Sequence, residues 1–374
     1  MALLMDEQKF QAFYRHTMMG YSKSFQRYVV NLMEKMGYIT FSNQVTMGEN
    51  SNILVYENKK DVSAVIADTT KRVELAGFYE YLEFVKLYKY SVPFFYELQS
   101  DAGSVESLLD SLGIASFSAK EFKPTLRIAA DFDDAVPFYY VQDRSVLIKF
   151  VLQKSYWNFE TMEIVDYRFP VVVFMDQERK ILEIRYDATK YDPKSAANSY
   201  EVLVKACAEW LKERMKLKLF RCDHQNIIDI INDEQNECVK IYKQMMEMNS
   251  GGSAELTASE STDYVLPFVG ELRELIEENK EIFDQSEEVK ELLLRYLGDK
   301  AATASYPYIY IKWLKAVDSD SFTVKVTFDY FSGNSTVLQH ITGECKDLGM
   351  ERMNDAIKYL CDSGSFTKGA EINV

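Results

Sequence analysis

The sequence has few of the residues, and none of the short motifs, on which common enzyme chemistries depend. Its 374 residues include five cysteines and three histidines. No G-x-x-x-x-G-K-[ST] phosphate loop and no G-x-G-x-x-G dinucleotide motif occurs in the chain, which excludes the common nucleotide-binding loops. His16 and His340 have no cysteine or serine nucleophile nearby in sequence, so a hydrolase triad has no support. We therefore expect a protein that is not an enzyme and needs no cofactor.

Secretion and membrane signals are also missing. The cysteines are scattered and odd in number, so they do not indicate a disulfide framework. The first ten residues, MALLMDEQKF, lack a basic segment followed by a long apolar stretch. No later run approaches the roughly 20 apolar residues that cross a bilayer. These absences predict a cytoplasmic protein that does not contact membranes.

Positive charge is in deficit, since the formal net charge is -15. Such a charge opposes unguided binding to phosphate backbones or anionic lipid. A nucleic-acid contact therefore requires a local basic face. Hydrophobic residues make up 47% of the chain, which is ample for folded cores, and the length predicts two or three domains.

Hydrophobic periodicity predicts an α+β fold. In the N-terminal part, the spacing predicts a helix over residues 6–36 with Gly20 as its breaking point and Gly37 as C-cap. It then predicts strands at 38–45, 52–56 and 62–67, a helix at 73–90, a buried strand in VPFFYEL and a short helix at 104–112.

Sequence patterns in the remaining chain predict two further domains. Residues 124–187 predict a largely antiparallel sheet, and residues 198–217 and 225–248 predict two helices. The segment NSGGSAELTASESTD predicts a flexible linker. An acidic helical stretch, three strands and a helix near Met350 to Cys361 follow. The expected domains are 1–115, 116–248 and 264–374, with the linker at 249–263.

The element order from about residue 24 to residue 98 resembles the core of the restriction-endonuclease-like superfamily, which carries the PD-(D/E)xK motif. That order is a helix ending in FQRYVVNLMEKMGY, a β-hairpin, a third strand, a helix and a strand. In the family, carboxylates hold Mg²⁺ at the scissile phosphate and a lysine helps to orient the attacking water. The resemblance implies a nuclease-like N-terminal domain.

This sequence departs from the family at each catalytic position. Asn52 stands where the aspartate is expected, and Ala67 and Thr69 stand where the final acidic residue and lysine are expected. An amide, a methyl and a hydroxyl cannot replace two carboxylates and an ammonium. The resemblance therefore implies an inactive relative with a nucleic-acid or protein interface, in genome maintenance or in defence against foreign nucleic acid.

Two carboxylate groups offer a catalytic alternative. Asp131, Asp133 and Asp134 follow a predicted strand and could bind Mg²⁺ in a nuclease or phosphoesterase, although a solvated turn also explains them. Asp176 and Glu183, with Arg185, resemble a nuclease hairpin and strand. Arginine is a poor group for orienting water, and a charged turn explains Asp176 equally well.

Three soft ligands offer a metal alternative. Cys222, His224 and Cys238 supply three of the four ligands of a structural zinc site, but their spacing matches no standard finger. Buried cysteines and an exposed histidine explain the same residues.

Basic and aromatic residues give the candidate binding surfaces. Arg15, Lys23 and Arg27 lie on the first predicted helix, and a second basic stretch holds Lys212, Arg214, Lys216, Lys218 and Arg221. The second stretch either meets phosphates or an acidic partner, or is a solvated helix C-terminus.

The strand YIYIKWLKAV is expected to have two different faces. One face holds Tyr308, Tyr310, Lys312 and Leu314, and the other holds Ile309, Ile311, Trp313 and Lys315. Aromatics on an exposed sheet face could stack on unpaired bases or pack against a partner. The alternative is core filling on one side and ordinary tyrosine-rich strand composition on the other. The preceding helix ELRELIEENKEIF is acidic over most of its surface and is expected to avoid phosphate.

Taken together, the residues predict a non-enzymatic binding or scaffold subunit. Its partner would be a protein or a second copy of the chain, or a nucleic acid bound through local basic faces. The alternatives are the Mg²⁺-dependent enzyme and a purely protein-binding assembly factor.

Overall fold

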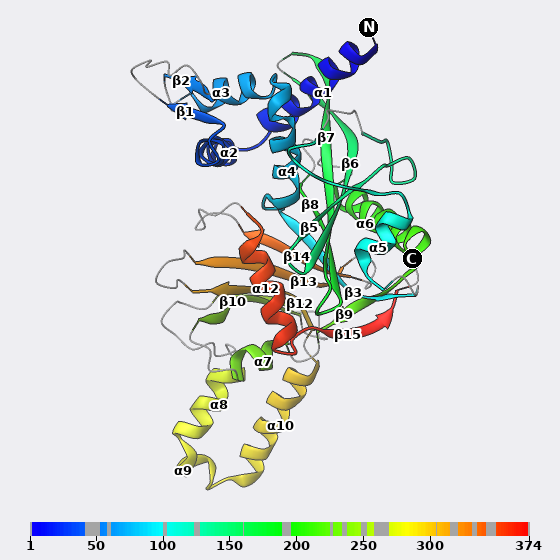
Figure 1. The fold of residues 1–374 in the computed structure, drawn as a ribbon. Coiled ribbons are helices and arrows are strands. Elements are labelled where there is room, and N and C mark those ends of the chain that lie inside the picture. Colours follow the sequence, from blue (N-terminus) through cyan, green and yellow to red (C-terminus); the bar gives the residue numbers. More distant parts are fainter. Residues whose placement is uncertain are drawn as a thin grey trace. The chain divides into compact units, whose positions relative to one another are not determined.

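The computed structural model describes residues 2–41, 53–57, 61–99, 103–122, 128–159, 161–188, 196–224, 227–233, 238–247, 253–257, 269–303, 305–314, 321–330, 335–341 and 349–372. The fold is α+β (Figure 1). The chain divides into two compact units, unit 1 (residues 1–219, 347–351 and 373–374) and unit 2 (residues 220–346 and 352–372). The expected boundary at residues 115 and 116 lies within unit 1.

The N-terminal part of unit 1 is helical. Its elements are α1 (Ala2–Met19), α2 (Lys23–Lys35), β1 (Ile39–Phe41), β2 (Leu54–Tyr56), α3 (Val62–Thr69), η1 (Val73–Leu75) and α4 (Ala76–Val85). The predicted break at Gly20 is confirmed, and Ser22 begins α2 by accepting a hydrogen bond from the backbone N–H of Phe25. Gly37 follows α2 with φ +77°, the left-handed conformation that glycine adopts at helix ends. These helices share a core that includes Val29, Ile66 and Phe78.

Two predictions in this part are wrong. Residues 62–67 form the start of α3 and not a strand, because Val62, Val65, Ile66 and Thr69 recur at helical spacing and are buried together, with Asp61 as N-cap. The pair β1 and β2 is parallel and therefore not a hairpin. Ala67 and Thr69 thus lie on a helix, and the strand on which the endonuclease motif was placed is absent from the described part of the chain.

A mostly antiparallel sheet forms the rest of unit 1. Its strands are β3 (Tyr90–Leu98), β8 (Ile181–Tyr186), β7 (Glu163–Asp176), β6 (Ser145–Asn158), β5 (Phe138–Gln142) and β4 (Ala115–Ser116), in that order across the sheet. The short strand β4 pairs in parallel with β5. The helices α5 (Val105–Ser111) and α6 (Ala196–Arg214) complete the unit. The buried strand in VPFFYEL and the antiparallel sheet are confirmed.

Unit 2 contains antiparallel strands in the order β11 (Ser253–Thr257), β10 (Val239–Glu247), β12 (Ser305–Trp313), β13 (Phe322–Asp329) and β14 (Ser335–Ile341). The chain divides within β9 (Leu217–Asp223), which pairs with β15 (Thr367–Glu371). The helices are α7 (Ile227–Asp233), α8 (Val269–Glu278), α9 (Lys280–Phe283), α10 (Glu287–Thr303) and α12 (Glu351–Asp362). Figure 1 shows α12 lying along one face of the sheet.

Two expectations for unit 2 are corrected. The predicted helix at 225–248 is short α7 followed by strand β10, in which Val239, Ile241, Gln244 and Met246 are buried in near alternation. The predicted linker at 249–263 contributes β11, which pairs with β10 from Ser253 to Thr257. The acidic helices, the three following strands and the closing helix are confirmed.

Candidate functional site

The two faces of strand β12 differ in kind. Ile309 and Ile311 are fully buried, whereas Tyr308 and Tyr310, which alternate with them, are half-buried. Trp313 shares the isoleucine face and contacts Tyr359 of α12, with ring centroids 6.1 Å apart. The isoleucine face is therefore the one that α12 covers, and the tyrosines point to the other side of the sheet.

Cross-strand pairing arranges basic and aromatic side chains in rows on the tyrosine side. Tyr310 pairs with Lys243 of β10 and with Lys325 of β13. Lys312, which follows Tyr310 by two residues on β12, pairs with Lys240 of β10. Since side chains alternate along a strand, these groups share one face. The lysine-tyrosine face is defined by Lys240, Lys243, Tyr308, Tyr310, Lys312 and Lys325, of which Lys312 is buried at 6% exposed and the others are half-buried.

Two lysines of this face, Lys243 and Lys325, lie over its tyrosine rings. The Nζ of Lys325 lies 3.8 Å from the ring centroid of Tyr308 and 5.7 Å from that of Tyr310. The Nζ of Lys243 lies 5.4 Å from the ring centroid of Tyr310. These are cation–π distances. One carboxylate joins the group: Glu255 of β11 pairs with Lys243 at 2.6 Å and accepts a hydrogen bond from the Tyr308 hydroxyl at 2.5 Å.

The titration of these groups reflects burial and the carboxylate of Glu255, whose hydrogen bond raises the pKa of Lys243. Burial lowers the pKa of Lys325, and the neighbouring ammonium of Lys243 lowers it further, while Glu255 acts in the opposite direction. The hydrogen bond to Glu255, together with burial, raises the pKa of Tyr308 to about 12. Among the described residues, Glu255 thus contacts both Lys243 and Tyr308 on this face.

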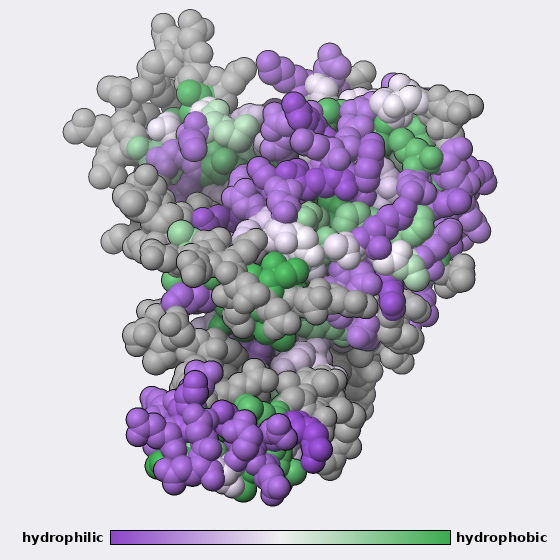
Figure 2. All heavy atoms as spheres, turned by 90° about the horizontal axis from the view of Figure 1, so that it is seen from below, coloured by the Kyte–Doolittle hydropathy of each residue, from purple (hydrophilic) through white to green (hydrophobic). Residues whose placement is uncertain are grey.

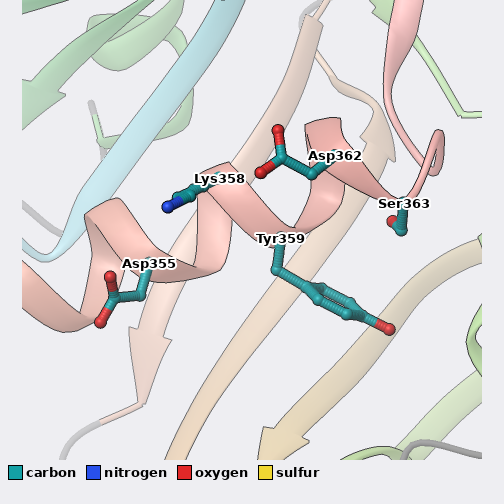
Figure 3. Close-up of a pocket in the computed structure, with 5 residues that line it drawn as sticks. All are labelled: Asp355, Lys358, Tyr359, Asp362 and Ser363. Carbon is teal, nitrogen blue, oxygen red and sulfur yellow. The ribbon is translucent and has the colours of Figure 1, made fainter.

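Unit 2 also has a shallow hollow of about 400 Å³ on α12, lined by Asp355, Lys358, Tyr359, Asp362 and Ser363 (Figure 3). In the figure, Asp355, Lys358 and Asp362 follow the helix, while Tyr359 extends over the neighbouring strands. The two aspartates and Lys358 are exposed. This arrangement of solvated charges gives no positioned group for chemistry.

Unit 1 holds a buried ionic cluster, which we call the buried quartet: Glu80 and Glu83 of α4, Lys149 of β6 and Arg168 of β7. All four residues are at most 3% exposed. The guanidinium of Arg168 donates to Glu83 at 3.0 and 2.7 Å and to Glu80 at 2.7 Å. Lys149 donates to Glu83 at 3.1 Å and also pairs with Glu80.

The buried quartet is electrically balanced and closed. Burial would raise the pKa of Glu80, but the charges of Arg168 and Lys149 outweigh burial and lower that pKa to about 2. Tyr14 of α1 adds a hydrogen bond to Glu80 and packs its ring 4.2 Å from the Arg168 guanidinium. Two carboxylates and two cations therefore tie α1, α4, β6 and β7 together, and none of them is accessible to a substrate.

Sequence reasoning missed the buried quartet, although a signal existed. Glu80 and Glu83 lie three residues apart on an otherwise apolar helix, so they share one face. Lys149 interrupts the apolar run SVLIKFVL. Charged residues inside apolar runs are rarely buried unless they are paired.

The carboxylates proposed for catalysis have structural roles. Asp131 is exposed and its Oδ1 accepts hydrogen bonds from the backbone N–H groups of Asp133 and Asp134, which is the arrangement of a polar turn. Asp176 likewise accepts from the backbone of a turn and pairs with Arg179 at 3.1 Å.

Glu183 and Arg185 are not available for catalysis either. Both are at most 1% exposed, and they pair with each other at 2.7 Å. The nuclease-like interpretation of this hairpin and strand is therefore not supported by its geometry, because the pair is sealed from solvent.

The proposed zinc ligands are not brought together. Within the described ranges, no group of three or more His, Cys, Asp or Glu side chains could hold a metal ion. Cys222 is buried on β9 and Cys238 is exposed before β10. His224 packs its ring 4.2 Å from that of Phe328. The described contacts of Cys222, Cys238 and His224 therefore do not join them in one metal site.

The remaining predicted positions are dispersed. Arg15, Lys23 and Arg27 are exposed, and Lys23 hydrogen-bonds to Ser63 of α3. Of the second stretch, Arg214 and Lys216 are exposed in unit 1, beside half-buried Lys212 and Lys218, and exposed Arg221 belongs to unit 2. Asn52 lies outside the described residues. Thr69 is buried and hydrogen-bonded to Tyr79 at 2.7 Å.

Comparisons with models of protein families, with curated proteins and with solved structures find no match to this chain. No helix among the described residues is long and apolar enough to cross a membrane. The candidate site therefore rests on the geometry of the lysine-tyrosine face.

Proposed function

We propose that this chain is a non-catalytic binding protein that holds an unpaired nucleic-acid strand on the lysine-tyrosine face of unit 2. The observation that carries the proposal is the row Lys243, Tyr310 and Lys325, which places an aromatic ring between two ammonium groups on a sheet side that α12 does not cover.

The chemistry of the face suits single strands. Proteins that bind unpaired strands combine cations that contact the phosphates with aromatic rings on which the bases stack. A duplex hides its base faces within the stack, so only an unpaired strand offers both features to one sheet face. A phosphate beside Lys325 would favour its charged form, because burial lowers the pKa of that lysine.

The net charge of the chain sets the selectivity of this site. At -15 the protein repels polyanions at long range. Among the described residues, three half-buried lysines against one glutamate make the lysine-tyrosine face a local exception. Binding would therefore occur at this face and not over the general surface.

Fluorescence anisotropy with labelled 20-nucleotide poly(dT), poly(U) and a duplex tests the proposal across salt concentrations. We expect single-strand binding that weakens with salt. Lys325→Gln should reduce the slope of log affinity against log salt by about 0.7, the value for one phosphate contact on a single strand. Tyr310→Ala should cost about 1–3 kcal/mol of binding, and Tyr310→Phe should retain most of it because the ring remains.

Lys358→Gln is the matched control, since Lys358 is an exposed lysine of the same unit on α12. It should leave the affinity unchanged. No binding at low salt, or an equal loss in the Lys358 and Lys325 variants, would remove the lysine-tyrosine face as the site.

A further inference from the structure

The helices α8 and α10, with the short α9 between them, form what we call the acidic helix pair. The hydrophobic core between its described side chains is small. Ile276 and Leu297 are buried between its arms, with Leu272, Phe283 and Leu293 partly buried against them. Yet Leu275, Ile282, Val289, Leu292, Leu294 and Tyr296 are each 42–65% exposed. Single exposed apolar residues are ordinary, but a group of them on one small element indicates a contact surface.

Helix geometry places several of these residues on one side. Leu275 directly precedes the inward-facing Ile276, and Leu292 directly precedes the inward-facing Leu293. Figure 1 shows α8 and α10 as two antiparallel arms. In an antiparallel pair, positions that directly precede the inward-facing ones fall on the same side of both helices.

The stripe on this side continues along α10. Val289, Leu292 and Tyr296 are spaced by three and four residues, which aligns them on one helix face. They are 47%, 55% and 55% exposed. The apolar surface of α10 is therefore wider than the part that α8 covers, and Leu275 extends it onto α8.

Charge identifies the partner that this side fits. From Val269 to Leu297 the sequence has nine acidic residues and four basic ones. Glu278 and Glu288 are exposed, and their helical spacing places them beside Leu275 and Leu292. Figure 2, which views the molecule from the end where Figure 1 shows these helices, shows hydrophobic atoms set among hydrophilic ones.

We propose that this side of the acidic helix pair docks a basic amphipathic helix of a partner protein. The partner helix would lay an apolar stripe along Leu275, Val289 and Leu292 to form a three-helix arrangement, with lysine or arginine beside the stripe facing the glutamates. This surface is separate from the lysine-tyrosine face and does not depend on nucleic-acid binding.

The test measures binding of fluorescent peptides to the intact chain by anisotropy. The probe is a synthetic 18-residue helix with leucines at i, i+3, i+7, i+10 and i+14 and lysines beside them. One control peptide has the leucines replaced by serine, and a second has the lysines replaced by glutamate. We expect the first peptide to bind, the two controls to bind at least about tenfold more weakly, and salt to reduce the binding.

Matched protein variants locate the surface. Leu292→Ser should weaken the peptide by about tenfold or more. Leu294→Ser makes the same chemical change at a residue that is 42% exposed but follows Leu293, on the other side of the pair, and it should change affinity less than about twofold. Neither leucine belongs to the buried core of the pair, so both variants should fold, which circular dichroism would confirm.

Three outcomes would overturn the proposal. The first is no peptide binding at 100 μM protein, and the second is equal loss in the Leu292 and Leu294 variants. The third is a dimer of the intact chain in sedimentation velocity that Leu292→Ser dissociates, because the occupant would then be a second copy of this chain.

Discussion

Replacing Lys149 by methionine should destabilise unit 1 far more than loss of a surface ion pair would. The substitution keeps the length and apolar stem of the side chain but leaves two carboxylates of the buried quartet against Arg168 alone. The ammonium has no exposed surface, and its partners Glu80 and Glu83 are 4% and 0% exposed as side chains. Removing one partner of a buried ion pair costs about 3–5 kcal/mol, because a buried charge is left uncompensated.

A double variant tests whether the cost is electrostatic. Adding Glu80→Gln to Lys149→Met restores one carboxylate against one guanidinium. We expect the pair of changes to cost about 2 kcal/mol less than the sum of the single changes, as residues in one ion-pair network do. Arg144→Met is the control, because Arg144 and Glu178 pair at 3.2 Å but are 79% and 55% exposed, and its cost should be below about 1 kcal/mol.

Urea unfolding followed by tryptophan fluorescence measures these costs. The chain has three tryptophans, of which Trp157 and Trp210 belong to unit 1 and Trp313 to unit 2. A Trp313→Phe background therefore reports unit 1 alone. The reasoning fails if Lys149→Met costs no more than Arg144→Met, or if Lys149→Met and Glu80→Gln are additive.

Two further predictions concern buried positions. His340 is 3% exposed, its Nε2 has no hydrogen-bond partner among the described residues, and burial lowers its pKa to about 4. Between pH 6.5 and 4 the imidazole of His340 binds a proton in the unfolded chain but not in the folded chain. The free energy of unfolding of unit 2 should therefore fall as pH drops from 6.5 towards 4. His340→Phe should flatten this pH dependence when unfolding is followed by the fluorescence of Trp313. Gly77→Ala would place a Cβ 2.1 Å from the backbone oxygen of Ala119, so it should cost unit 1 about 1–3 kcal/mol in urea unfolding instead of the gain of about 1 kcal/mol that alanine gives in an open helix.

Local patterns predicted most elements because their signals are independent of tertiary context. The periodicity around Gly20 predicted both α1 and α2, and the runs of 124–187 predicted an antiparallel sheet that the structure confirms. The failures at Val62–Thr69 and Val239–Glu247 share one cause. A short segment that mixes apolar and polar residues fits a strand or a helix, and burial against neighbours decides which one forms.

The candidate site was only half predictable for a related reason. The alternation in YIYIKWLKAV predicted that Tyr308, Tyr310 and Lys312 share one face. It did not predict Lys243 or Lys325 beside them, because cross-strand neighbours depend on register. In addition, the prediction of a helix at 225–248 assigned Lys243 to a helix and not to a strand of this sheet. The row of Lys243, Tyr310 and Lys325 comes from three strands, and the sequence of β12 alone predicts only the position of Tyr310.

The average charge of the chain conceals how charge is distributed in unit 2. The acidic helix pair has nine acidic residues in 29 positions, whereas the described part of the lysine-tyrosine face has three half-buried lysines and one carboxylate. Long-range repulsion between the chain and a polyanion is screened beyond about 8–10 Å at physiological salt, while contacts at the face act over a few ångströms. A net charge of -15 thus opposes binding over the whole surface but leaves a compact cationic site effective, so the acidic composition and a proposed nucleic-acid site are compatible.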